Sequence, residues 1–212
     1  MIEFYDIAWL AIKGANPADL LHALNLSEPI TELDWNTGVS EIAGDMWDDV
    51  PFSRLYVSPS IQGWVLVIGD WISQTDEVKI CKTLSLNYEE VWAFGTQMRM
   101  DFWLYLCCKN GQVIRHFEKD GDKIIDTGVP LPPEKKLRKA SLLDEEADLD
   151  DPENWYGEDI VLGIAATYTL DPNQIKEEWL HNQFGLLAVT DIGRQQGISQ
   201  RPIQPWKKPG IQ

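Results

Sequence analysis

The sequence predicts an α+β protein with a largely antiparallel, twisted β-sheet and helices packed on it. Three observations support this class. The stretch Arg54–Gly128 consists of β-prone runs separated by turn residues. Within it, Asn110-Gly111 and Asp120-Gly121 each join two such runs, as tight hairpin turns do, and so predict three sequential strands in a meander. Helical periodicity is confined to a few segments outside the meander, which is typical of α+β proteins.

The elements follow from local patterns in chain order. Helices are expected where apolar residues recur at helical spacing behind a capping residue, such as Asn16 before Pro17. The expected helices cover Pro17–Leu26, Asp76–Leu84, Glu158–Thr169 and a segment from Asp171 to about Asn182. The expected strands cover Glu3–Lys13, Ile30–Trp35, Arg54–Ser58, Trp64–Trp71, Trp92–Met98, Arg99–Cys108, Val113–Glu118, Lys123–Thr127 and Phe184–Thr190. The last strand is expected at an edge of the sheet.

The remaining segments are predicted to be irregular. Between Ser27 and Phe52 the chain is acidic, and Asn36-Thr37-Gly38 indicates a turn. We expect a single domain over residues 1–193, with an acidic loop at about residues 144–157. The tail 194–212 has no periodicity and is expected to be loosely ordered.

Size and composition indicate a cytoplasmic protein. A chain of 212 residues can bury a substantial core. No apolar run reaches the roughly 18–20 residues of a membrane span, and Glu3 and Asp6 stand where a signal peptide carries basic residues. The three cysteines provide no disulfide framework, and Cys107 and Cys108 are expected to point to opposite faces of a strand as buried apolar residues.

Charge is the strongest global feature of the chain. Lys and Arg total 18 against 34 Asp and Glu, which gives a formal net charge of -16. Such a surface repels nucleic acid and anionic membranes and favours a basic protein partner, although solubility alone explains the charge equally well. Two acidic segments are the candidate partner-binding surfaces. They contain Asp45, Trp47, Asp48, Asp49, Asp144, Glu145, Glu146, Asp148, Asp150, Asp151 and Glu153.

Motifs for catalysis, cofactors and metals are not found in the sequence. Neither phosphate-binding glycine motif occurs, and zinc-ligand spacing is missing. The acidic run from Asp148 to Glu153 lacks the glycine that an EF-hand loop needs at its sixth position. The histidines, His22, His116 and His181, stand in no nucleophile motif. We therefore expect no catalytic residues, no cofactor, no metal and no enzymatic activity.

Small size, strong acidity and the lack of catalytic motifs resemble bacterial toxin-immunity proteins. The resemblance implies a protein that covers the active site of a cationic toxin domain and neutralises it, with electrostatic steering to speed capture. The alternative is an enzyme or small-molecule-binding protein that uses an aromatic-rich face of the sheet. Its pocket would be lined by Trp64, Trp92, Trp103, Arg115 and His116.

Overall fold

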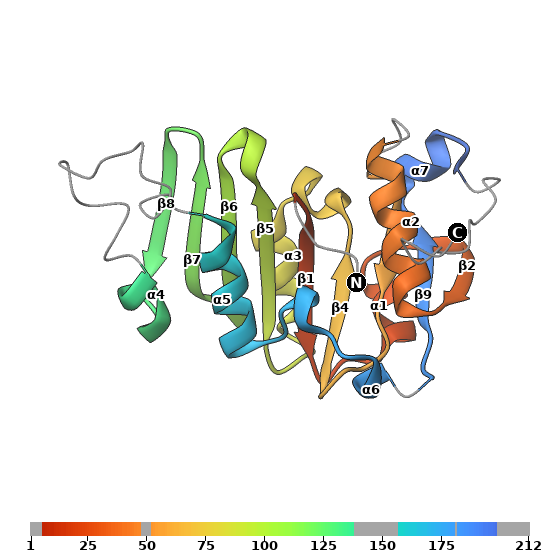
Figure 1. The fold of residues 1–212 in the computed structure, drawn as a ribbon, viewed down its shortest axis with the longest axis horizontal. Helices are drawn as coiled ribbons and strands as arrows, with labels where there is room; N and C mark the ends of the chain where they lie inside the picture. Colours follow the sequence, from red (N-terminus) through yellow and green to blue (C-terminus); the bar gives the residue numbers. More distant parts are fainter. Residues whose placement is uncertain (1–5, 48–51, 138–156, 181, 199–212) are drawn as a thin grey trace, which may run out of the picture.

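The computed structural model describes residues 6–47, 52–137, 157–180 and 182–198. They form one nine-stranded sheet in which every pairing is antiparallel, in the order β2-β9-β3-β4-β1-β5-β6-β7-β8 (Figure 1). The strands are β1 (Ala8–Lys13), β2 (Ser27–Leu33), β3 (Arg54–Val57), β4 (Trp64–Ile68), β5 (Val91–Gln97), β6 (Phe102–Lys109), β7 (Gln112–Asp120), β8 (Lys123–Gly128) and β9 (Gly185–Val189). The predicted α+β class with an antiparallel sheet is confirmed.

Helices cover both faces of the sheet, so that the molecule has three layers. The α-helices are α1 (Pro17–Ala23), α2 (Trp35–Trp47), α3 (Glu77–Leu84), α4 (Pro132–Leu137), α5 (Glu158–Tyr168), α6 (Glu177–Leu180) and α7 (Asp191–Gln195). The short 3-10 helices are η1 (Asp70–Gln74), η2 (Met98–Met100) and η4 (Pro172–Gln174). Helix α2 packs on β3 and β9, and α5 on β5 and β6, on one face of the sheet (Figure 1). Helices α1 and α3 and the η1 segment cover the opposite face.

Strand β1 shows how the two cores arise. Trp9 and Ala11 belong to the core under α2 and α5, whereas Leu10 and Ile12 belong to the core under α1 and α3. Because side chains alternate across a strand, a strand that is covered on both faces must be apolar at consecutive positions. The fully buried Trp64–Ile68 strand confirms the same expectation for β4.

The predicted meander is confirmed in β6, β7 and β8. Asn110 and Gly111 between β6 and β7 both have positive φ, at 50° and 72°, which is the backbone conformation of a type I′ hairpin turn. Gly121 has the same left-handed conformation between β7 and β8, with φ of 55°. Glycine adopts this conformation without the steric cost that a Cβ brings, and asparagine tolerates it better than most residues.

The position predicted for the last strand is wrong. Strand β9 lies inside the sheet, where Leu187 pairs with Thr31 of β2 on one side and with Tyr56 of β3 on the other. Leu187 and Ala188 are buried on opposite faces of the sheet. Strand β9 is therefore an interior strand, paired with a strand on each side and with apolar side chains buried on each face of the sheet.

The prediction of an irregular segment after Leu33 is also wrong, because residues Trp35–Trp47 form α2. Asp34 provides the start of this helix: its Oδ1 accepts the Thr37 backbone N–H at 3.0 Å, and its Oδ2 accepts the Thr37 hydroxyl at 2.6 Å. A side-chain acceptor at the helix start satisfies a backbone donor that has no partner inside the helix. Asn36-Thr37-Gly38 is thus the first turn of a helix and not a loop turn.

Two further boundaries differ from the expectation. Asp171 does cap a helix, but the helix is the short η4, and a separate α6 follows in place of one continuous segment. Helix α7 runs through Arg194, so it crosses the boundary that was predicted between domain and tail. Residues 199–212 lie outside the described part of the chain. None of the described helices is long and apolar enough to cross a membrane.

Candidate functional site

The five residues of the predicted aromatic pocket do not come together in one pocket. Trp64, Trp92 and Trp103 are buried in the core under α2 and α5. Trp92 stacks on Tyr168 of α5, with ring centroids 5.4 Å apart. His116 pairs with Leu106, which belongs to the opposite core. Neighbouring strand residues point to opposite faces, so Arg115 and His116 cannot line the same pocket.

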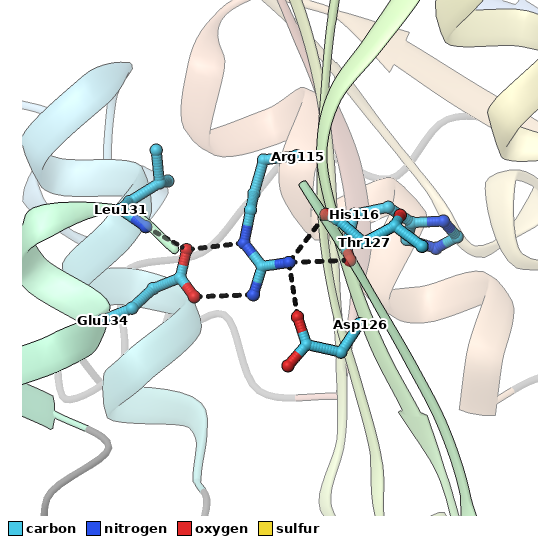
Figure 2. A network of polar contacts seen from close by, with 6 residues as sticks. All are labelled: Arg115, His116, Asp126, Thr127, Leu131 and Glu134. Carbon is cyan, nitrogen blue, oxygen red and sulfur yellow. Dashed lines mark hydrogen bonds and ion pairs between the residues drawn. The ribbon is translucent and has the colours of Figure 1, made fainter. Parts of the chain in front are cut away.

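Arg115 is the centre of a buried polar network that Figure 2 shows. Its Nε and Nη2 donate to the two carboxylate oxygens of Glu134 at 2.8 and 2.7 Å. Its Nη1 donates to Asp126 Oδ1 at 2.7 Å and to the carbonyl oxygens of His116 and Thr127. The guanidinium also lies 5.5 Å from the centre of the Tyr105 ring. Because Arg115 lies on β7 and Glu134 on α4, this network holds α4 against the sheet.

The predicted partner-binding residues fall almost entirely outside the described residues. Asp45 and Trp47 belong to the last turn of α2, so they lie on a helix and not in the loop that the sequence suggested. The others, which stay a prediction, are Asp48, Asp49, Asp144, Glu145, Glu146, Asp148, Asp150, Asp151 and Glu153.

All three cysteines are buried, as predicted. Cys107 and Cys108 point into opposite cores. Burial raises the pKa of the Cys107 thiol to about 12, and the negative charge of Glu90 acts in the same direction. A thiol with so high a pKa carries almost no thiolate near neutral pH and is a poor nucleophile.

A cavity of about 400 Å³ opens on the α3 face of the sheet, between η1, the start of α3 and the ends of β5, β6 and β7. The apolar part of its wall includes Ile72, Phe102 and Leu104. The wall also contains the carboxylates of Glu77, Glu118 and Asp120. An apolar pocket with a few convergent polar groups is the usual form of a small-ligand site.

His116 lies beside two of these carboxylates. The ligand atoms of Glu77, His116 and Glu118 all lie within 4.8 Å of one another, and His116 Nε2 is 3.0 Å from Glu118 Oε2. His116 and Glu118 are two positions apart on β7 and therefore share a face. Glu77 comes from the first turn of α3, which Asp76 fixes by accepting the Lys79 N–H at 2.8 Å. Burial raises the pKa of the Glu77 carboxyl, the negative charge of Glu118 adds to the shift, and His116 opposes it.

Of the three residues, His116 alone was a candidate from the sequence, and the two carboxylates were not predicted. Glu118 could have been found, because an acid two positions after a histidine on a strand shares its face. Glu77 could not, because only the packing of α3 on β5 and β6 brings it to the histidine.

Two other carboxyl groups have raised pKa values. Burial raises the pKa of Asp70 to about 6, and among the described residues nothing forms a hydrogen bond with its buried Oδ1. Burial likewise raises the pKa of Glu158 to about 7, and the negative charge of Asp6 raises both values further. Burial favours the neutral form of both carboxyl groups, so ionising either of them costs free energy.

Comparison of the chain with protein-family models, with curated proteins and with solved structures finds no match.

Proposed function

We propose that this protein is a binding module that captures and neutralises a basic protein domain, in the manner of the bacterial toxin-immunity proteins it resembles. The observation that carries the proposal is the net charge of -16, with nine acidic and no basic residues between Asp144 and Asp159. A field of this sign attracts a cationic partner over about 10 Å at moderate ionic strength and raises its association rate.

The edge of the sheet at β8 supports a protein-binding role. Within the described residues, β8 has a strand neighbour on one side only, and all six of its residues are exposed. Ile124 and Ile125 are 53% and 41% exposed. A strand edge with unpaired backbone groups and exposed apolar side chains is suited to pairing with a strand of another protein.

The charge and the edge are close in the sequence. Helix α4 follows β8 almost directly, and the acidic run follows α4 in the chain. Charge would steer the basic partner, and the strand edge would provide short-range contacts. Electrostatics acts mainly on the association rate, whereas buried contacts set the dissociation rate.

The experiment is capture of binding proteins from the source cell, followed by kinetics with the purified partner. We expect a stoichiometric complex with a basic protein, whose association slows strongly between low and physiological salt. Neutralising Asp148, Asp150 and Asp151 together, each to Asn, should reduce the association rate at low salt. An association rate that neither salt nor this triple change alters would refute the proposal.

A matched pair of variants tests the edge. Ile124→Lys puts a charge on the exposed face of β8, and Leu86→Lys makes the same change at another exposed position, where Leu86 is 70% exposed. Both variants add one positive charge, so the change in net charge is the same in each. We expect Ile124→Lys to weaken binding about tenfold more than Leu86→Lys, a difference of about 1.4 kcal/mol. Equal affinities of the two variants would show that β8 is not part of the interface.

A further inference from the structure

We propose that Glu77, His116 and Glu118 form a binding site for a divalent transition-metal ion of the Zn²⁺ type, with an open coordination position toward the cavity between η1, α3 and the sheet. The inference is independent of the protein-binding role. It depends on the identity of the three side chains, the distances between their ligand atoms and the cavity beside them.

The donor set selects the class of ion. One imidazole and two carboxylates are donors that zinc, manganese and iron accept together, whereas magnesium and calcium prefer oxygen donors alone. The two carboxylates carry two negative charges when ionised, which a dication neutralises. The ligand atoms of Glu77 and Glu118 lie within 4.8 Å of each other, a distance at which two ionised carboxylates repel. An ion between them converts this repulsion into attraction.

The distances fit a single ion. Two ligand atoms at about 2.1 Å from a tetrahedral zinc lie about 3.4 Å apart. His116 Nε2 and Glu118 Oε2 are 3.0 Å apart, close to that value. The Glu77 carboxylate oxygen lies within 4.8 Å of both, so a small side-chain rotation completes the set. His116 Nε2 faces the carboxylate of Glu118, so an ion between them would contact both groups.

Two of the three proposed ligands lie on β7, a strand that is paired on both sides. His116 is 7% exposed and lies on β7, which is paired on both sides by β6 and β8. Glu118 has the same two neighbours, and its side chain is 21% exposed. Ligands held on paired strands and a capped helix start lose little freedom on binding an ion, which favours affinity.

The cavity gives the site its open position. Glu77 and Glu118 belong to the wall of the cavity of about 400 Å³, and within the described residues this cluster has three protein ligands. Zinc sites with three protein ligands keep the fourth position for water or a small ligand, whereas structural zinc sites are closed by four protein ligands. The geometry therefore points to an ion that small molecules in the cavity can reach.

The test is metal titration of the full chain after removal of bound ions with a chelator. Calorimetry with Zn²⁺ should give one tight site per chain, and Mg²⁺ and Ca²⁺ should not compete for it. Co²⁺ should give a visible absorption band of low-coordinate cobalt without a thiolate charge-transfer band, because the ligands are nitrogen and oxygen. Saturating Zn²⁺ should raise the thermal unfolding temperature, since the ion binds the folded state.

Matched variants separate this site from unspecific binding by an acidic surface. Glu77→Gln and His116→Gln should each lower Zn²⁺ affinity at least about tenfold, as loss of a ligand does. The controls are Glu89→Gln and His22→Gln, which change exposed residues of the same types. If His116→Gln fails to fold, Glu118→Gln takes its place.

Two results would overturn the proposal. One is binding that is weak, exceeds one ion per chain and is equal in the site variants and the controls. The other is tight binding with a thiolate charge-transfer band, which would assign the ion to the cysteines.

Discussion

Arg115 and Glu134 form a two-point ion pair in which both side chains are fully buried. The two charge-assisted bonds measure 2.8 and 2.7 Å, and both side chains are 0% exposed. Glu134 Oε1 also accepts the backbone N–H of Leu131, so the same carboxylate fixes the turn that leads into α4. Forming such a pair costs free energy, because both charges lose their hydration. Removing one partner costs more, because the other charge then remains in the core without a counter-charge.

Glu134→Ala is therefore expected to destabilise the protein strongly. Asp126 would remain as a partially exposed partner of Arg115, with 39% of its side chain exposed. We expect a loss of about 3 kcal/mol in the free energy of unfolding, because the guanidinium loses its only buried counter-charge among the described residues. Urea unfolding followed by circular dichroism measures the change.

The exposed pair Arg194–Asp191 provides the control. These side chains are 39% and 55% exposed. Asp191→Ala should lower the free energy of unfolding by no more than about 1 kcal/mol, as exposed ion pairs contribute little. Equal losses for Glu134→Ala and Asp191→Ala would show that the buried pair does not hold α4 to the sheet.

Asp70→Asn is expected to stabilise the protein at alkaline pH. The pKa of Asp70 is about 6 in the folded state, above its ordinary value of 3.8. The folded state thus binds more protons than the unfolded state between pH 4 and pH 6, so stability falls as pH rises through this window. At pH 8 the variant should be more stable by about 2 kcal/mol, and near pH 4 the difference should vanish. Asp122→Asn, the same change at an exposed turn residue, is the control.

Glu158→Gln tests the same principle at a higher pH. Burial raises the pKa of Glu158 from 4.5 to about 7, and the negative charges of Asp6, Asp159 and Asp171 add to the shift. The folded state holds the extra proton up to about pH 7, and its stability falls as pH rises through that value. Glutamine keeps an acceptor for the Thr96 hydroxyl, which donates to Glu158 Oε1 at 3.3 Å. Thermal unfolding should therefore show a higher Tm for the variant at about pH 8.5 and equal Tm values near pH 4. A constant Tm difference across this range would contradict the assignment.

Gly38→Ala tests the packing of α2 on the sheet. A Cβ at this position would lie 2.2 Å from Cε2 of Tyr56. Alanine favours a helix over glycine by about 1 kcal/mol, but overpacking a core costs about 1–3 kcal/mol. We expect a net loss of about 1 kcal/mol in the free energy of unfolding. In a Tyr56→Leu background the clash is gone, so the same change should be neutral or stabilising, and a double-mutant cycle measures the difference.

Local chemistry explains which parts of the fold could be predicted. Asn110-Gly111 and Asp120-Gly121 encode their turns within a few residues, and the meander between β6 and β8 followed from them. The interior position of β9 could not be predicted, because its partners β2 and β3 lie far away in the sequence. Helix α2 was missed for a different reason: Gly38 favours turns in general, and only its contact with Tyr56 explains a glycine there.

In the candidate site, too, local sequence indicated some residues, whereas their partners depended on distant parts of the chain. His116 stood out in the sequence by its residue type, but its role depended on what α3 placed beside it. Arg115 was predicted to line a pocket on the aromatic-rich face of the sheet. Its partner Glu134 lies on α4, beyond the next strand, and nothing local in the sequence pairs the two.

The interior position of β9 has a consequence for the order in which the protein can form during synthesis. Ribosomes deliver the chain from the N-terminus, so the strands from β3 to β8 can pair while the C-terminal part is still being made. Strand β2 pairs with β9 alone among the described strands, and β3 has β9 as its second neighbour. Until residues Gly185–Val189 emerge, β2 stays without its partner strand and β3 presents an open edge. The nascent chain thus exposes one flank of its sheet to chaperones and to other chains until β9 can pair.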